Sequence, residues 1–187
     1  MKNSGTVRME TKRLVLRPFV IEDAGAMFRN WANDPQVTKF LSWEPHKDAE
    51  ETRRILEGWI KSYESKDFYT WAIAWREDEG NVIGSIAVPQ LNQKAGRVTV
   101  GYCLGRKWWG NGIMKEAFAE LIRFFFEVEG ANRVEALHDT RNVNSGKVMM
   151  ACGLKKEGTL RQYGWNNQGI CDECIYGMVA SDYFEGK

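Results

Sequence analysis

The sequence of 187 residues predicts a mixed α/β fold (α+β), in which helices cover both faces of a mostly antiparallel central sheet. Segments with the alternation of strands and segments with helical spacing follow one another along the whole chain. The turn signal Glu79-Gly80-Asn81 joins two strand patterns as a hairpin, which makes them antiparallel. A long amphipathic helix separates two later strand patterns, and a connection of that length joins parallel strands by a right-handed crossover.

The first half of the chain predicts an opening strand, two helices and a hairpin. Residues 13–18 alternate, and residues 24–31 have helical spacing. Asp34-Pro35 predicts a short helical turn with Asp34 as its cap. Residues 48–65 predict the second helix, and residues 69–75 and 82–88 the strands of the hairpin. The packed side of the second helix would consist of Ile55, Leu56, Trp59, Ile60 and Tyr63.

The second half predicts the strand–helix–strand unit and three further elements. Residues 97–104 and 132–139 are the two strand patterns, and residues 112–129 are the helix between them. Residues 142–151 predict a helix that Gly153 ends in a left-handed conformation. Residues 154–165 and 173–180 predict the last strands. The apolar stripes of the long helix are Ile113, Ala117, Leu121 and Phe125, and Met114, Phe118, Ile122 and Phe126.

Composition restricts the partners and the location of the protein. The chain has 26 basic and 25 acidic residues, a balance that argues against nucleic acid and anionic membranes as partners. No apolar run reaches the roughly 18 to 20 residues of a membrane-spanning helix. Residues 1–10 lack the apolar segment of a signal peptide, so we expect a cytoplasmic protein. The length suits one domain, residues 1–187.

The cysteines predict neither a metal site nor a redox site. Cys171 and Cys174 form a single C-x-x-C, whereas zinc would need a second pair or two nearby histidines. The chain has two histidines, His46 and His138, which lie far apart in the sequence. A redox C-x-x-C normally begins a helix, but a strand pattern follows Cys174. We therefore expect reduced, half-buried cysteines.

The segment Trp109-Gly-Asn-Gly-Ile-Met114 predicts an anion site, because two glycines at a helix start leave backbone N–H groups uncovered. A nucleoside-triphosphate loop would require Lys-Ser/Thr after Gly112, where Ile113-Met114 stands. A dinucleotide fingerprint would require a glycine at Lys115 and an acid near Asn132. The segment therefore indicates a phosphate ligand of another kind.

A second motif follows the crossover strand. It consists of Asn142-Val-Asn-Ser145, Met149, Gly153-Leu154 and Glu157-Gly158. Together with residues 109–117, it resembles the GNAT superfamily of acetyl-CoA-dependent N-acetyltransferases. Residues 11–18 (Thr-Lys-Arg-Leu-Val-Leu-Arg-Pro) and 172–178 resemble its RimJ/RimL-like branch, which is named for the acetylation of ribosomal-protein N-termini. The similarity spans nearly the whole chain.

The resemblance implies a single GNAT-like domain whose strand–helix–strand core binds CoA. It also implies a transferase that moves an acetyl group from acetyl-CoA, without a metal, to a small-molecule or peptide amine. The amine would attack the thioester directly in a ternary complex. Because RimJ/RimL-like proteins often pair, we expect a homodimer. An antibiotic- or metabolite-modifying acetyltransferase on the same scaffold is an alternative.

The chain departs from the family pattern at several positions. Lys107 stands where the family has Gln or Arg and keeps a charge suited to phosphate. Met149 replaces a tyrosine that protonates the departing thiolate in many members, whereas Ser145 occupies the position of the serine used in the RimL type. Gly164 stands where some relatives have a glutamate base. Because of Met149 and Gly164, a non-catalytic acyl-CoA-binding sensor is a further alternative.

The resemblance also implies roles for individual residues. Ser145 would be the proton donor, and Trp43 and Glu44 would border the acceptor. Alternatively, Asn142 and Ser145 cap a helix, Trp108 and Trp109 are core anchors, and Cys103 is a strand residue rather than a nucleophile. The base would be Glu44, Glu135, Asp172, Glu173 or a water relay. The cofactor-binding residues would be Tyr102, Cys103, Leu104, Lys107, Trp109, Gly110, Asn111, Gly112, Ile113, Met114 and Asn142.

Overall fold

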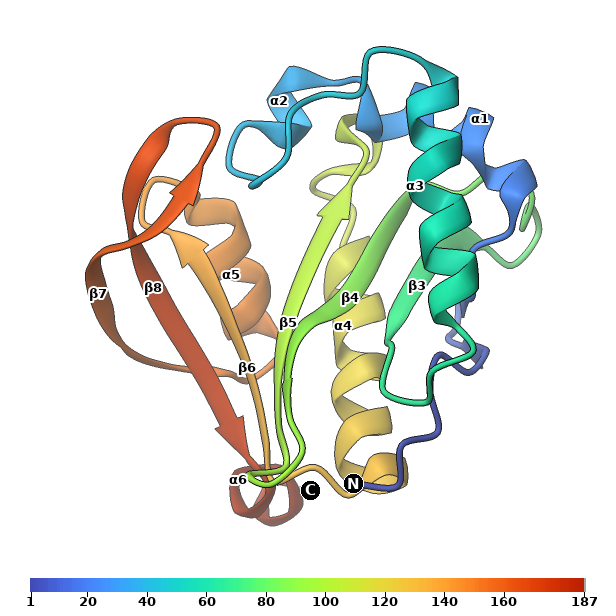
Figure 1. The fold of residues 1–187 in the computed structure, drawn as a ribbon. Helices are drawn as coiled ribbons and strands as arrows, with labels where there is room; N and C mark the ends of the chain where they lie inside the picture. The colour runs from blue at the N-terminus through green and yellow to red at the C-terminus, as the bar shows by residue number, and fades with distance from the viewer. Residues whose placement is uncertain (187) are drawn as a thin grey trace.

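An eight-stranded mixed sheet lies between two groups of helices (Figure 1). The computed structural model describes residues 1–186. The strand order is β1-β2-β3-β4-β5-β6-β8-β7. The strands are β1 (Met9–Glu10), β2 (Leu14–Arg17), β3 (Thr70–Trp75), β4 (Gly84–Asn92), β5 (Arg97–Leu104), β6 (Arg133–Asp139), β7 (Lys155–Asn166) and β8 (Gly169–Val179).

The predicted helices are present at their expected places. Asp34 caps α2 by accepting a hydrogen bond from the N–H of Gln36, and Asp48 caps α3 in the same way from Glu51. The first and the long helix each end in a π-helical segment, Phe28–Ala32 and Phe124–Glu129. The α-helices are α1 (Ala24–Met27), α2 (Pro35–Thr38), α3 (Ala49–Ser62), α4 (Ile113–Arg123), α5 (Val143–Ala151) and α6 (Ala180–Glu185).

Strand pairing confirms the predicted mixed sheet. β3 and β4 are antiparallel, as the hairpin signal indicates. β5 and β6 are parallel and are joined through α4. Every other neighbouring pair of strands in the described chain is antiparallel.

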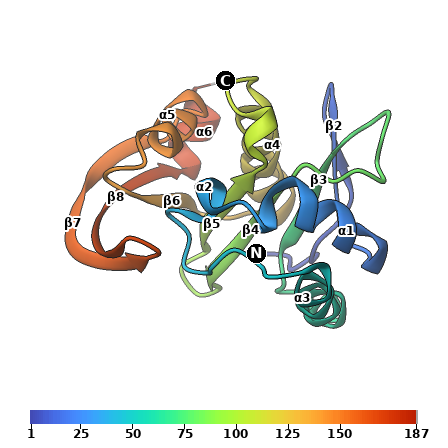
Figure 2. The same cartoon turned by 90° about the horizontal axis from the view of Figure 1, so that it is seen from above.

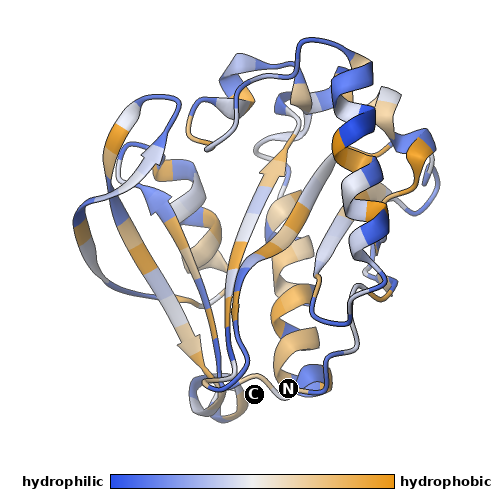
Figure 3. Cartoon of the chain, in the orientation of Figure 1, coloured by the Kyte–Doolittle hydropathy of each residue, from blue (hydrophilic) through white to orange (hydrophobic). Residues whose placement is uncertain are grey.

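The helices form two layers, with α4 and α5 on one face of the sheet and α1 and α3 on the other (Figure 2). Both predicted stripes of the long helix are buried, and most of the α4 ribbon has the colour of hydrophobic residues in Figure 3. The packed side predicted for α3 is partly wrong. Leu56 is fully buried, but Ile55 and Ile60 are 40% and 36% exposed, because α3 packs along a narrower line than the sequence suggests.

Three features of the fold differ from the prediction. The sequence did not predict β1, because its two residues are too few to show alternation. The sequence did not predict α6, which begins at Ala180, the last residue of the final predicted strand. β8 begins at Gly169, four residues before the predicted start, because a tight turn pairs Asn166 with Gly169. Cys171 and Cys174, which were expected to be half-buried, are both buried, and both are free thiols.

Two negative findings apply to residues 1–186. No helix in this range has the length and apolar character needed to cross a membrane. No three His, Cys, Asp or Glu side chains of this range lie together in a way that could hold a metal ion.

Candidate functional site

β5 and β6 separate toward their carboxyl ends, and this opening is the centre of the candidate site. Arg97–Val100 of β5 pair with residues 133–136 of β6. Within the described residues, the pairing between the two strands ends there. Beyond it, β5 stays paired with β4 up to Leu104, whereas β6 stays paired with β8 up to Asp139. The edge of Tyr102, Cys103 and Leu104 that faces β6 is therefore left without a strand partner (Figure 1).

A bulge in β4 contributes to the separation. The register between β4 and β5 shifts between Ala87 and Gln90, a segment that contains Pro89. Proline lacks an N–H and cannot donate to the ladder, and a bulge bends its strand and increases the local twist. The Pro89 ring lies against Gly101, where β5 begins to leave β6.

The glycine loop lies directly after β5 and leads into α4. Gly110 and Gly112 have positive φ values of 76° and 71°, which glycine adopts without strain. Gly112 is the residue before the first helical turn, and no side chain caps the helix there. The N–H groups of Ile113 and Met114 therefore have no intrahelical acceptor. An uncapped helix start of this kind can bind an anion, because its free N–H groups and the positive end of the helix dipole point the same way.

The two tryptophans of the loop differ in burial. Trp108 is partly buried against the core, as a core anchor would be. Trp109 is 45% exposed, so its interpretation as a core anchor is wrong. Its indole N–H donates to the carbonyl of Leu104 at 2.7 Å and thereby fixes the loop to the end of β5. The exposed Lys107 has its ammonium group 5.5 Å from the centre of the Trp108 ring.

A hollow adjoins this loop on the side of α1 and α2. Its volume is about 440 Å³, and it is open to solvent. Arg106 donates to Asp34 at 3.0 Å across it. The hollow is lined by Arg29, Asn30, Asp34, Arg106, Lys107 and Trp108.

The first turn of α5 lies beside the open edge of β5. The Tyr102 hydroxyl donates to the carbonyl of Ser145 at 3.0 Å, and its ring packs on Phe118 of α4. Asn142 precedes the helix, but its side chain makes no capping hydrogen bond. Burial is the larger effect on the Tyr102 hydroxyl and raises the pKa of Tyr102, although a side-chain hydrogen bond with Ser145 acts against it. The structure thus joins Tyr102 and Ser145 and leaves the side chain of Asn142 unused as a cap.

On the opposite face, the connection between α2 and α3 meets the tip of the β7–β8 hairpin. The side-chain amide of Asn167 donates to the carbonyls of Thr38 and Trp43, at 2.9 and 2.8 Å. The backbone N–H of Asn167 donates to Leu41 at 3.1 Å. Trp43 is half-buried and Glu44 is exposed, both on the connection that reaches the hairpin. Sequence analysis missed Asn167, because a polar residue in a turn carries no signal of its distant partners.

Two carboxylates near the opening are held in ion pairs. Glu135 is buried and accepts hydrogen bonds from Thr99 at 2.9 Å and Arg133 at 2.7 Å. Asp139 is also buried and accepts from Arg141 and from Asn166. Hydrogen bonds from Arg141 hold the pKa of Asp139 well below its usual range. The oxygens of both carboxylates are therefore already engaged by arginine and other donors.

Glu173 differs from these acids. Its carboxylate has no hydrogen-bond or ion-pair partner within residues 1–186. Burial, together with the nearby charge of Asp139, raises the pKa of Glu173 above its ordinary value. A Cβ at Gly164 would collide with this carboxylate, so Glu173 occupies the space beside the position of the missing glutamate. Asp172, next to it, accepts from the N–H of Gln162 at 2.8 Å.

Cys103 lies on β5 with its thiol 3.3 Å from the Ser85 hydroxyl. Burial raises the pKa of this thiol to about 11. A thiol that stays protonated near neutral pH is a poor nucleophile, as expected for a structural strand residue.

Comparisons with known proteins agree with this geometry. A family model described as an acetyltransferase (GNAT) domain matches residues 13–155. The chain is 32% identical over 171 residues to the uncharacterized N-acetyltransferase YoaA of Bacillus subtilis, covering 91% of this chain and 96% of the relative. It is 26% identical over 192 residues to the ribosomal protein uS5-alanine N-acetyltransferase of Escherichia coli, covering 99% and 97%.

Solved structures show the same fold. The ribosomal-protein-S5-alanine acetyltransferase of Vibrio fischeri has a TM-score of 0.81 and 22% identity, covering 95% of this chain and 98% of that protein. The microcin C7 self-immunity acetyltransferase MccE, in complex with acetyl-CoA and AMP, has a TM-score of 0.81 and 18% identity, with coverage of 90% and 93%. The family model spans most of the chain, and the resemblance to the RimJ/RimL-like branch is confirmed. The chain therefore belongs to the GNAT N-acetyltransferase family and is an acyltransferase.

Proposed function

We propose that the protein uses acetyl-CoA as co-substrate and acetylates a primary amine by direct attack in a ternary complex. The observation that carries this proposal is the unpaired edge of β5 next to the uncapped start of α4. A fold relative, MccE, has been solved with acetyl-CoA bound. The edge and the helix start suit the two ends of such a ligand, an amide-containing arm and a pyrophosphate.

The end of β5, the loop that follows it and the start of α5 hold acetyl-CoA, the acetyl donor. The backbone N–H groups from Trp109 to Met114 bind the pyrophosphate, and Lys107 adds positive charge beside them. The free edge of residues 102–104 pairs with the pantetheine amides, as an added strand would, and directs an N–H toward the thioester oxygen. Asn142 binds the same arm, because its side chain is not used as a cap.

The transfer requires two proton movements. The amine nitrogen attacks the thioester carbon, the carbon–sulfur bond breaks, and the amine loses one proton while the thiolate gains one. Ser145 gives its proton to the departing sulfur. Glu173 takes the proton of the amine, because Glu135 and Asp139 are paired with arginines and Glu44 is exposed to solvent.

The acceptor we propose is the N-terminal amine of a protein. Relatives that align over nearly the whole chain include acetyltransferases named for the alanine of ribosomal protein uS5. Trp43 and Glu44 lie on the connection held by Asn167, where they border the acceptor. Antibiotic and other small-molecule amines are the competing class.

The test is the release of free thiol from acetyl-CoA with a panel of acceptors. The panel contains peptides with a free N-terminus, the same peptides with an acetylated N-terminus, polyamines and aminoglycosides. We expect release with the free peptides and none with their acetylated copies. Release with aminoglycosides alone would overturn the protein acceptor. Binding of acetyl-CoA without release on any acceptor would indicate a sensor, and no binding would overturn the site itself.

A further inference from the structure

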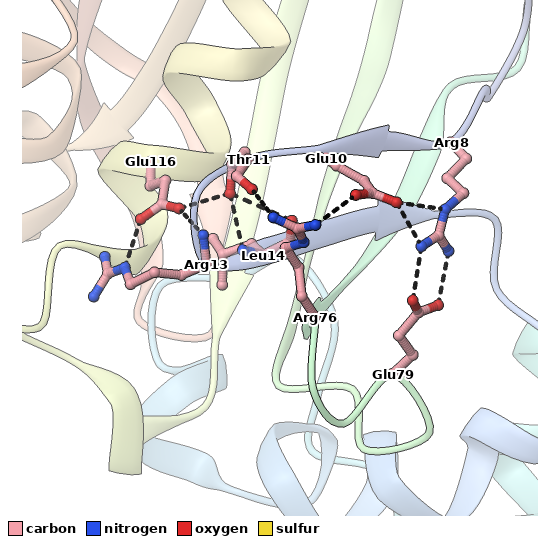
Figure 4. Close-up of polar contacts among 8 residues, drawn as sticks. All are labelled: Arg8, Glu10, Thr11, Arg13, Leu14, Arg76, Glu79 and Glu116. Carbon is pink, nitrogen blue, oxygen red and sulfur yellow. Dashed lines mark hydrogen bonds and ion pairs between the residues drawn. The ribbon is translucent and has the colours of Figure 1, made fainter.

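The turn between β1 and β2 is bound to the glycine loop and to the first turn of α4. Figure 4 shows its contacts with Glu116 of α4. Both terminal nitrogens of Arg13 donate to the carbonyl of Asn111, each at 3.2 Å. Its Nε donates to Oε2 of Glu116 at 2.6 Å. Oε1 of Glu116 accepts from the Thr11 hydroxyl at 2.6 Å and from the Arg13 N–H at 2.8 Å. One guanidinium thus joins the loop to the helix.

Glu116 anchors this arrangement from the helix side. Its side chain is 19% exposed. Burial alone would raise the pKa of Glu116, but the hydrogen bonds from Thr11 and Arg13 outweigh burial and lower it. The carboxylate is therefore ionised near neutral pH and holds Arg13 in one orientation.

The contact to Asn111 has a consequence for the next peptide group. In a planar trans peptide, the N–H of Gly112 points opposite to the carbonyl of Asn111. Asn111 stands between two glycines with positive φ, and glycine tolerates either sign of φ. A flip of this peptide would therefore cost little backbone strain. It would replace an N–H donor by a carbonyl oxygen on the side where an anion binds.

We propose that Arg13 is a positioning residue for the phosphate loop, which keeps the Asn111–Gly112 peptide in the orientation that presents its N–H to the pyrophosphate. This inference rests on the proposed use of acetyl-CoA. The segment Thr11-Lys-Arg13 has no role in the proposed transfer reaction, and this inference gives it one. Arg13 also neutralises Glu116, whose charge would otherwise repel phosphate at the start of α4.

The test compares Arg13→Gln with Arg76→Gln. Arg76 lies in the same network and pairs with Glu10 at 3.3 Å, but none of its contacts is to the loop (Figure 4). Affinity is measured by titration calorimetry with CoA and with pantetheine, which has the same arm without the diphosphate. Arg13→Gln should weaken CoA binding about ten- to a hundredfold, the range expected for lost hydrogen bonds to a charged group. Its pantetheine affinity should stay unchanged, and Arg76→Gln should change neither.

Loss of both affinities in Arg13→Gln would mean general disruption of the site and would overturn the proposal, as would unchanged CoA binding. If Arg13→Gln fails to fold, Arg13→Lys serves instead. It keeps the charge but cannot reach Asn111 and Glu116 together, so we expect a smaller loss confined to CoA. Because CoA binding is measured without an acceptor, this result can be interpreted even if the proposed transfer reaction fails.

Discussion

Substitution of Gly112 tests the phosphate site most directly. Gly112 has a φ of 71°, and the nearest heavy atom to an added Cβ is Nη2 of Arg13 at 3.8 Å. A side chain there has space, so the folded state loses only backbone energy. Gly112→Glu places a carboxylate where the pyrophosphate is expected, and Gly112→Ala causes the same strain without the charge.

The magnitudes separate these two effects. A left-handed conformation costs a residue with a Cβ about 1–2 kcal/mol, which lowers the melting temperature of either variant by about 2–8 °C. Acetyl-CoA at a hundred times its Kd stabilises the wild type by about 2.7 kcal/mol, a rise of about 5–11 °C. A carboxylate about 4 Å from a phosphate repels it by about 4 kcal/mol at an effective dielectric constant of 20. This repulsion exceeds the stabilisation by the ligand.

The assay is thermal unfolding of the three proteins with and without acetyl-CoA. We expect the shift in the wild type and in Gly112→Ala, and no shift in Gly112→Glu. The baseline melting temperatures of the two variants should agree, because both adopt the same strained φ. An unchanged shift in Gly112→Glu would refute the assignment of the phosphate to this helix start.

Four further predictions concern the chemistry and the stability of the site. Ser145→Ala should lower turnover while acetyl-CoA affinity stays the same; full activity would contradict its role as acid. Glu173→Gln should lower kcat about a hundredfold or more and remove the acid limb of the pH–rate profile, a limb displaced upward because the pKa of Glu173 is raised. Cys103→Ala should retain activity, since the pKa of its thiol is about 11; an inactive, folded variant would argue for a chemical role. Asp139 has a lowered pKa, so its contribution to stability is complete above about pH 4 and is lost on acidification below it. Urea unfolding between pH 2 and 5 should show this loss in the wild type and less of it in Asp139→Asn.

Local patterns predicted the parts of the fold that depend on neighbouring residues. The strand Arg97–Leu104 has the predicted bounds, and both apolar stripes of the following helix are buried, because alternation and helical spacing are themselves short-range signals. Gly110 and Gly112 adopt positive φ as the loop requires. Short elements such as β1 and α6 were missed, because two to six residues are too few to show a periodic pattern. Tertiary contacts stabilise such elements.

The sequence by itself determined the mixed sheet, the strand–helix–strand unit, the glycine loop at a helix start and the family to which these motifs belong. The tertiary structure alone decided which acid is free, which tryptophan is exposed and how the loop is held. Glu135 and Glu173 have the same chemistry, but Arg133 neutralises the first and the second has no partner in the described chain. Arg13 and Asn111 are 98 residues apart, and they meet because the β1–β2 turn packs beside the start of α4. Hydrogen bonds and ion pairs depend on distance in space, which the order of residues along the chain does not specify.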